Sequence, residues 1–122
     1  MGLVRGDLTY FLLKKSLDAY FLRHKVIANN IANADTPGFK RGEVIFEEKL
    51  KKALGGNFPL NKLEEVKPEI VLDLNSSWRE DFNNVDIEKE MVNLSKSSLQ
   101  YNLCIQLIDK KFQRIKMAIQ GK

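Results

Sequence analysis

The chain has 122 residues, of which 43% are hydrophobic and 30% charged, and its formal net charge is +4. This length suits one unit, the composition excludes a disordered tail, and no apolar run reaches the ~18 residues of a membrane span. With one cysteine, Cys104, and one histidine, His24, neither a disulfide framework nor a zinc module can be built. Nucleotide-binding glycine motifs and nucleophile elbows are also missing, so the sequence predicts neither a cofactor nor an enzyme.

The positive charge is spread along the chain rather than gathered in one tract. Basic and acidic residues number 10 and 6 in residues 1–54, 3 and 6 in residues 55–84, and 7 and 4 in residues 85–122. Nucleic-acid binding needs lysine and arginine on one face. The charge therefore does not favour DNA, although a basic helical hairpin that binds DNA or an acidic partner stays open as an alternative.

The N-terminal third predicts a long amphipathic helix, because apolar residues recur there at intervals of three and four. We expect the helix to begin near Asp7 and to end before Pro37, since proline disfavours helical geometry at Thr36. Pro37 and Gly38 then favour a turn with Gly38 at positive φ. The residues of this row are Tyr10, Leu13, Leu17, Tyr20, His24, Ile27, Ile31 and Ala34.

The middle of the chain gives weaker signals. Residues 44–54 favour a short helix that carries Phe46 and Leu50 and is ended by Gly55. Residues 69–74 alternate polar and apolar groups, which indicates a short strand. Residues 78–82 either pair with that strand or lie as an irregular arm.

The C-terminal part carries an apolar pattern in steps of three and four, with no proline or glycine between Val85 and Gln120. This predicts one helix of about 33 residues, roughly 50 Å long, with Asn83 or Asn84 as its N-cap. The residues of this row are Ile87, Met91, Leu94, Ser98, Tyr101, Ile105, Ile108, Phe112, Ile115 and Ile119.

The rest of the chain has few apolar residues, so the two long helices must bury their apolar faces against each other. We therefore predict a mostly α fold, in which the terminal helices pack as an antiparallel hairpin or coiled coil with a small irregular or short-β middle arm. The unit divides into residues 1–36 (N-terminal helix and motif), 37–84 (middle arm) and 85–122 (C-terminal helix). The apolar rows exceed what one hairpin can bury, so assembly with other copies is expected.

Residues 28–39 read Ala-Asn-Asn-Ile-Ala-Asn-Ala-Asp-Thr-Pro-Gly-Phe, an unusual way to end a helix. The three asparagines cost about 1–2 kcal/mol of helix propensity, so their amides either fix a register against a neighbouring helix or subunit, or the helix frays before the turn. This motif, together with Asn-Asn-Val-Asp at 83–86 before the second long helix, resembles the flagellar rod and hook axial proteins. The similarity is greatest to proximal-rod subunits of type B, with type C as the alternative.

The resemblance implies a structural subunit of the bacterial flagellar basal-body rod that polymerises through its terminal helices, transmits torque and lines the export channel. It also implies export from the cytoplasm by the flagellar type III apparatus without a cleaved signal peptide, and assembly in the periplasmic space. The implied partners are other copies, other rod subunits, the adapter between rod and membrane ring, and the export apparatus. Neither nucleic acid nor a small-molecule substrate is implied.

We expect the assembly contacts in two groups of residues. The first is the motif and its turn: Asn29, Asn30, Ile31, Asn33, Thr36, Pro37, Gly38 and Phe39. The second is the start of the C-terminal helix and its apolar row: Asn84, Asp86, Met91, Leu94, Tyr101, Ile105, Ile108, Phe112 and Ile115. His24 and Cys104 are interpreted as packed residues. Trp78, Arg79 and Phe82 either contact the next subunit or pack on the hairpin.

Overall fold

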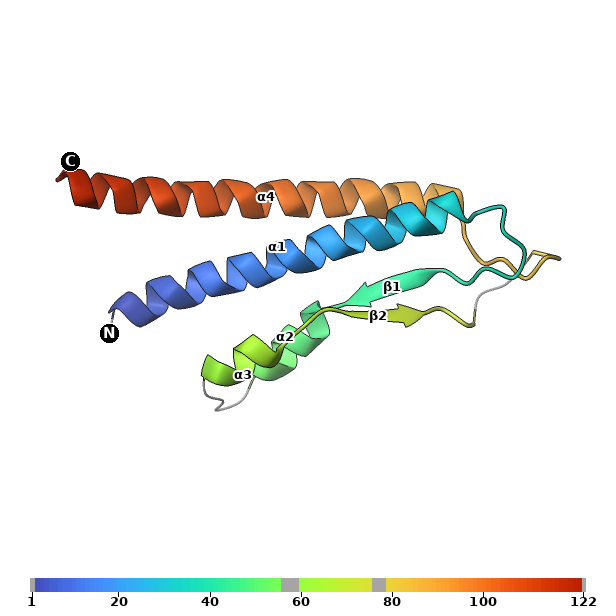
Figure 1. Cartoon of the computed structure of the whole chain (residues 1–122), viewed down its shortest axis with the longest axis horizontal. Helices are drawn as coiled ribbons and strands as arrows, with labels where there is room; N and C mark the ends of the chain where they lie inside the picture. Colours follow the sequence, from blue (N-terminus) through green and yellow to red (C-terminus); the bar gives the residue numbers. More distant parts are fainter. Residues whose placement is uncertain (1, 56–59, 76–78, 122) are drawn as a thin grey trace.

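Two long antiparallel helices dominate the molecule, and both chain termini lie at the same end of it (Figure 1). The computed structural model describes all residues except 1, 56–59, 76–78 and 122, and the side chains of residues 2–7 and 60–62 are also outside the description. The elements are α1 (Gly2–Ala32), β1 (Gly42–Ile45), α2 (Glu47–Leu54), α3 (Leu60–Glu65), β2 (Glu69–Leu72) and α4 (Ile87–Gln120). The predicted mostly α hairpin with a short-β middle arm is confirmed.

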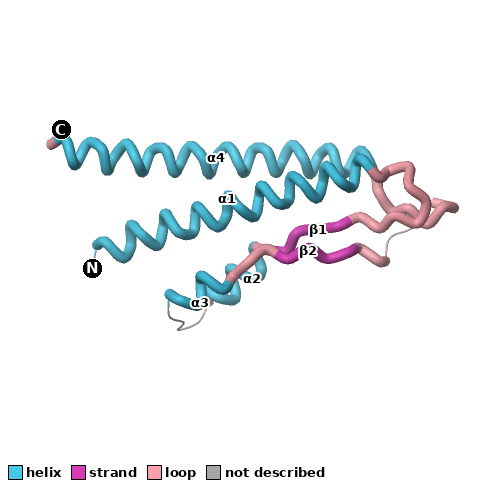
Figure 2. Tube along the Cα trace, in the orientation of Figure 1, coloured by secondary structure: helices cyan, strands magenta, loops and turns pink. Residues whose placement is uncertain are grey.

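Helix α1 lies between α4 and the middle arm (Figures 1 and 2). It contacts α4, most closely toward the loop end of the hairpin (Figure 1), and it contacts strand β1 on its other side. As a result α1 is covered on two sides, whereas α4 is covered mainly by α1. None of the described helices is long and apolar enough to cross a membrane.

The N-terminal helix is longer than predicted at its start and ends as predicted. It begins at Gly2 rather than near Asp7, and it ends at Ala32. In the turn that follows, the Phe39 amide donates to the Thr36 carbonyl at 3.2 Å. Gly38 has φ +76°, which confirms the predicted turn with glycine at positive φ.

The C-terminal helix begins two residues later than predicted, at Ile87, and its N-cap is Asp86 rather than Asn83 or Asn84. The Asp86 carboxylate accepts hydrogen bonds from the amides of Glu88 (3.1 Å) and Lys89 (3.3 Å). Both of the predicted capping asparagines are committed to other contacts, described below.

Replacing Asp86 by alanine removes the acceptor for these two amides, and it is expected to lower the free energy of unfolding by about 1 kcal/mol. Urea unfolding followed by circular dichroism measures the loss. Asp86→Asn keeps an oxygen acceptor at the cap and should recover most of the stability. An equal loss in the two variants would contradict the capping role.

The middle arm is built on a two-stranded antiparallel sheet, with Gly42 opposite Leu72 and Ile45 opposite Glu69. The predicted helix over residues 44–54 was wrong at its start, because Val44 and Ile45 belong to strand β1 and α2 begins at Glu47. Helix α3 was not predicted. Residues 79–82 do not join the sheet and form a turn, while Trp78 lies outside the described residues.

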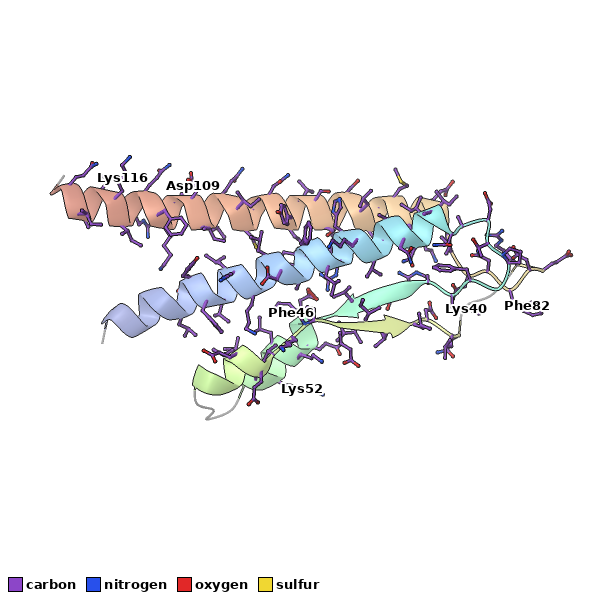
Figure 3. The ribbon with its side chains drawn as sticks, viewed as in Figure 1. Lys40, Phe46, Lys52, Phe82, Asp109 and Lys116 are labelled. Atoms are coloured by element: carbon purple, nitrogen blue, oxygen red, sulfur yellow. The ribbon has the colours of Figure 1, made fainter. Side chains whose placement is uncertain are left out.

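The arm packs on α1 through a small core. Buried Ala19 of α1 meets Phe46 and Val66 of the arm, and Figure 3 places Phe46 at the junction between the sheet and α2. The ammonium group of Lys15 donates to the carbonyls of Glu64 (2.8 Å) and Val66 (2.6 Å). These contacts tie the end of α3 to the middle of α1.

A second tie joins α1 to the start of α2. The Arg23 guanidinium donates to both carboxylate oxygens of Glu47, at 2.7 and 2.9 Å, and to the Val44 carbonyl at 2.9 Å. The hydrogen bond from Arg23 lowers the pKa of Glu47 despite partial burial. The bond to Val44 also covers part of the free edge of strand β1, which blunts its tendency to pair with other chains.

Candidate assembly interface

Helix α4 turns a row of residues at seven-residue spacing toward α1. This row is Glu90, Ser97 and Cys104, which are 1%, 1% and 7% exposed. The Ser97 hydroxyl donates to the Tyr20 carbonyl of α1 at 3.3 Å. The side chains of Ser97 and Cys104 are small, which lets the two backbones approach closely at these two positions. Burial also raises the pKa of the Cys104 thiol, and the interpretation of Cys104 as a packed residue is confirmed.

The predicted apolar row lies beside this seam rather than on it. Leu94, Ser98, Tyr101 and Ile108 are half-buried. The other members stay 42–80% exposed; we call them the flank row: Ile87, Met91, Ile105, Phe112, Ile115 and Ile119. Two aromatic contacts to α1 lie along this side, Tyr10 with Phe112 (ring centroids 5.6 Å apart) and Phe21 with Tyr101 (6.4 Å).

A second set of exposed apolar residues runs along the opposite side of α4. We call it the back row: Val92, Leu99, Leu103 and Met117, which are 54–71% exposed. Their spacing of seven, four and fourteen residues keeps them on one helix face. Besides the row that meets α1, helix α4 therefore carries exposed apolar residues on its flank and on its back.

The central asparagine of the motif points inward. Asn30 is 1% exposed, and its amide nitrogen donates to the Gly42 carbonyl (2.9 Å) and to the Glu90 carboxylate (3.2 Å). Its amide oxygen accepts from the Gly42 amide at 2.9 Å. One side chain thus joins α1, β1 and α4. The motif therefore sets the register between elements of the same chain.

The carboxylate of Glu90 is also paired with an arginine. Arg41 Nε donates to Glu90 at 2.6 Å, and the same guanidinium pairs with Glu43 and, at 3.5 Å, with Asp73. Burial acts to lower the pKa of Arg41, but hydrogen bonds to Glu43 and Glu90 outweigh it, and the pKa is raised. A charged cluster therefore sits where α1, α4 and the sheet converge.

Two adjacent asparagines before α4 close the loop end of the hairpin. The amide nitrogen of Asn83 donates to the carbonyls of Asn33, Ala34 and Thr36 at 2.8–3.0 Å. The amide group of Asn84 links the backbones of two segments, since it accepts from the Arg41 amide (2.7 Å) and donates to the Asp73 carbonyl (2.6 Å). Neither side chain is free to cap α4.

The remaining motif residues form local contacts near the surface. Asn33 donates to the carbonyl and the side chain of Asn29, at 2.8 and 3.2 Å, and accepts from the Thr36 hydroxyl at 3.2 Å. Asn29, Thr36, Pro37 and Gly38 are exposed, while Ile31, Asn33 and Phe39 are half-buried. The asparagines therefore brace the end of α1 and the turn that follows.

The structure divides the predicted assembly residues into two classes. Asn30 and Asn84 are buried inside the chain and Asp86 caps α4, whereas the flank row is open to partners. The sequence interpretation gave no role to Arg41 or to burial of Glu90. The seven-residue spacing of Glu90, Ser97 and Cys104 was the available signal. Within the described ranges, no three His, Cys, Asp or Glu side chains are grouped to hold a metal ion.

Comparisons with known proteins identify the family of the chain. The family model described as "Flagella basal body rod protein" matches residues 22–40, the last third of α1 and the turn that follows it. The "Flagellar basal body rod protein FlgB" of Borrelia hermsii is 36% identical, with 93% of this chain and 97% of the relative aligned. The FlgB proteins of Aquifex aeolicus (30% identical, 100% and 98% aligned) and Bacillus subtilis (29%, 89% and 91%) are similar over the same extent. The chain belongs to the FlgB family of flagellar basal body rod proteins.

Proposed function

We propose that the chain is a structural subunit of the flagellar basal-body rod that polymerises through α1 and α4. One observation carries the proposal. Apart from its contact with α1, α4 leaves the flank row and the back row largely exposed to solvent. A helix that is apolar on several sides is typical of one surrounded by other helices. Continuous exposed apolar surface of this kind marks protein–protein contact sites.

The partners that fit these rows are helices with matching apolar stripes. Other copies of this chain and other rod subunits provide them, packed as in a coiled coil. The internal contacts of Asn30, Glu90 and Asn83 support the same function, because they keep one hairpin geometry for every subunit. A structural role of this kind needs no catalytic residues, and the DNA-binding and enzyme alternatives are not favoured for a FlgB-family chain.

Three finer statements belong to the same proposal. The bundle of terminal helices lines the hollow rod, and its tight packing transmits torque along the axis. The subunit is exported by the type III apparatus without a cleaved signal peptide and assembles in the periplasmic space, where it also meets the adapter between rod and membrane ring. Among the described residues, two features are compatible with export as an extended chain: a small core and a single, unpaired cysteine.

The test places charges in the flank row. Met91→Lys and Ile105→Lys are expected to abolish rod assembly, because a lysine cannot be buried in an apolar helix contact without a partner. Each variant is expressed in a strain of the source bacterium that lacks the gene. Swimming is scored, and rods are counted in purified basal bodies by electron microscopy.

The matched control is Asn75→Lys, which adds the same charge at an exposed polar position of the middle arm, away from the flank row and the back row. It should restore swimming and rods as the unaltered gene does. Circular dichroism of the purified variants should show folded hairpins, since Met91 and Ile105 are 50% and 42% exposed in the free subunit. Normal rods with both flank-row variants would overturn the proposal.

A further inference from the structure

An aromatic side chain is held out into solvent at the loop end of the hairpin. Phe82 is 68% exposed, and its φ is +64°, a left-handed conformation that residues other than glycine and asparagine rarely adopt. Figure 3 shows Phe82 at the end of the molecule opposite the chain termini, near Lys40. Strained backbone of this kind persists where surrounding contacts impose it, and it is concentrated at functional sites.

The contacts that impose this conformation lie on both sides of Phe82. Its amide donates to the Arg79 carbonyl at 3.1 Å, and its carbonyl accepts from the Lys40 ammonium group. The preceding carbonyl, of Asp81, accepts from the Gly38 amide at 2.7 Å, and the following residue is the clamped Asn83. The loop therefore fixes the backbone and leaves the phenyl ring free, which is the geometry of a presented anchor.

An aromatic hollow lies on the flank of the same hairpin. It has a volume of about 310 Å³ and is lined by Phe21, His24, Ser98, Tyr101 and Asn102. It sits between α1 and α4, and Ser98 and Tyr101 belong to the same apolar row as the flank-row residues, which makes it part of the surface proposed for assembly. A phenyl ring matches this lining, because aromatic rings pack favourably edge to face or offset against one another.

One charged residue near the ring and one beside the hollow have opposite signs. Near the ring, Asp81 is paired with Arg79 at 3.1 Å and the Lys40 ammonium group bonds the Phe82 carbonyl, so exposed Glu80 is the acidic residue there that makes no ion pair among the described contacts. The ammonium group of Lys25 lies 4.6 Å from the centre of the Phe21 ring at the edge of the hollow. One acidic residue, Asp18, lies one turn from Phe21 on α1, and the three lining residues from α4, Ser98, Tyr101 and Asn102, carry no charge. Complementary charge of this kind orients an encounter and fixes its register.

We propose that Phe82 of one copy inserts into the aromatic hollow of a second copy of this chain. The inference rests on the proposed polymerisation and names one contact of it. Along α4 the hollow is about 20 Å from the loop end, at 1.5 Å per residue between Ile87 and Tyr101, so the ring cannot reach the hollow of its own chain. The contact is head-to-tail, so each copy offers a ring to one neighbour and a hollow to another, and copies add in an open, staggered series.

The first test separates this contact from folding. Phe82→Gly removes the ring and relieves the left-handed strain, so the free subunit should unfold at the same urea concentration as the wild type or at a higher one. Its self-association, measured on the purified full chain by sedimentation velocity, should be about 10- to 100-fold weaker. Leu74→Ala is the control: Leu74 is 69% exposed on the middle arm, and its loss should leave association unchanged.

The second test uses the opposite charges. Glu80→Lys and Lys25→Glu should each weaken self-association alone, whereas an equal mixture of the two variant chains should associate like the wild type. In the mixture, a ring-to-hollow contact between unlike variants pairs a lysine with a glutamate, whereas a contact between like variants sets equal charges against each other, so the two variants should alternate along the series. Wild-type association by Phe82→Gly, failure of the mixture to recover, or no association of the wild-type chain would each overturn the inference. Loss of rods with the flank-row variants would leave the proposed function standing in each of these cases.

Discussion

Replacing Glu90 by alanine is expected to lower the free energy of unfolding by about 2–4 kcal/mol, because a buried charge that accepts two hydrogen bonds is removed and each of its two partners loses a contact. The Glu90 carboxylate is 1% exposed and accepts from Arg41 at 2.6 Å and from Asn30 at 3.2 Å. Its loss leaves the Arg41 guanidinium, whose side chain is 14% exposed, with Glu43 and Asp73 as its remaining partners. Asn30 would keep only its bonds to Gly42.

Urea unfolding followed by circular dichroism measures this loss. Glu88→Ala is the matched control, because Glu88 is an exposed acid in the same turn of α4, and its loss should cost less than about 1 kcal/mol. Arg41→Ala and the double variant complete a double-mutant cycle, in which the double variant should lose clearly less than the sum of the single losses. Additive losses, or a Glu90→Ala variant as stable as Glu88→Ala, would show that the buried pair does not couple α4 to the sheet.

The two long helices and their antiparallel packing could be predicted because the apolar residues repeat over many turns. The side of α4 that faces α1 could not be read from the same pattern. The most regular apolar row is the flank row. Ser97 and Cys104 nevertheless face α1, because small residues allow the backbones of two helices to approach closely. Glu90 falls on their line, and a glutamate is rarely fully buried unless it is paired. Its partner, Arg41, is 49 residues away in the sequence.

The N-cap of α4 shows a second limit. Residues 83–86 contain three side chains that are good N-caps, and local preference ranks asparagine and aspartate about equally. Tertiary contacts decide among them. The segments around Thr36 and Arg41 bind Asn83 and Asn84, which leaves Asp86 for the helix.

Strand β1 was missed for a related reason. A strand of four residues shows too few polar–apolar alternations to be distinguished from the first turn of the helix that follows it. Its partner in the sheet, β2, is also distant in the sequence, since Ile45 pairs with Glu69. Its free edge is satisfied by α1, through Asn30 to Gly42 and Arg23 to Val44. The asparagine of the motif was correctly singled out as a register device, but its contact with β1 and α4 depends on a fold that the sequence pattern did not define.

Replacing Asn83 by alanine is expected to lower the free energy of unfolding by about 1–3 kcal/mol, since the buried Val85 amide loses its acceptor and three carbonyls each lose one of their donors. The side chain is fully buried. Its nitrogen donates to the carbonyls of Asn33, Ala34 and Thr36, and its oxygen accepts from the Val85 amide at 2.8 Å. Without it, the carbonyls of Asn33, Ala34 and Thr36 keep their bonds from Thr36, Arg79 and Phe39, but the Val85 amide has no other acceptor among the described contacts.

The same urea experiment with Gln106→Ala provides the control, because that variant removes an amide from an exposed position of α4 and should change stability by less than about 0.5 kcal/mol. Asn83→Asp sharpens the test. It preserves the shape and the bond from Val85, but it sets a carboxylate against three carbonyl oxygens, so at neutral pH it should be at least as destabilising as alanine. The three carbonyl oxygens raise the folded-state pKa of the introduced carboxyl above the unfolded value of about 4. Protonation restores a donor, so the gap between Asn83→Asp and the wild type should narrow as the pH falls toward about 4 and stay constant below it. A gap that is constant with pH, or an Asn83→Asp variant as stable as the wild type, would rule out the donor role of the Asn83 amide.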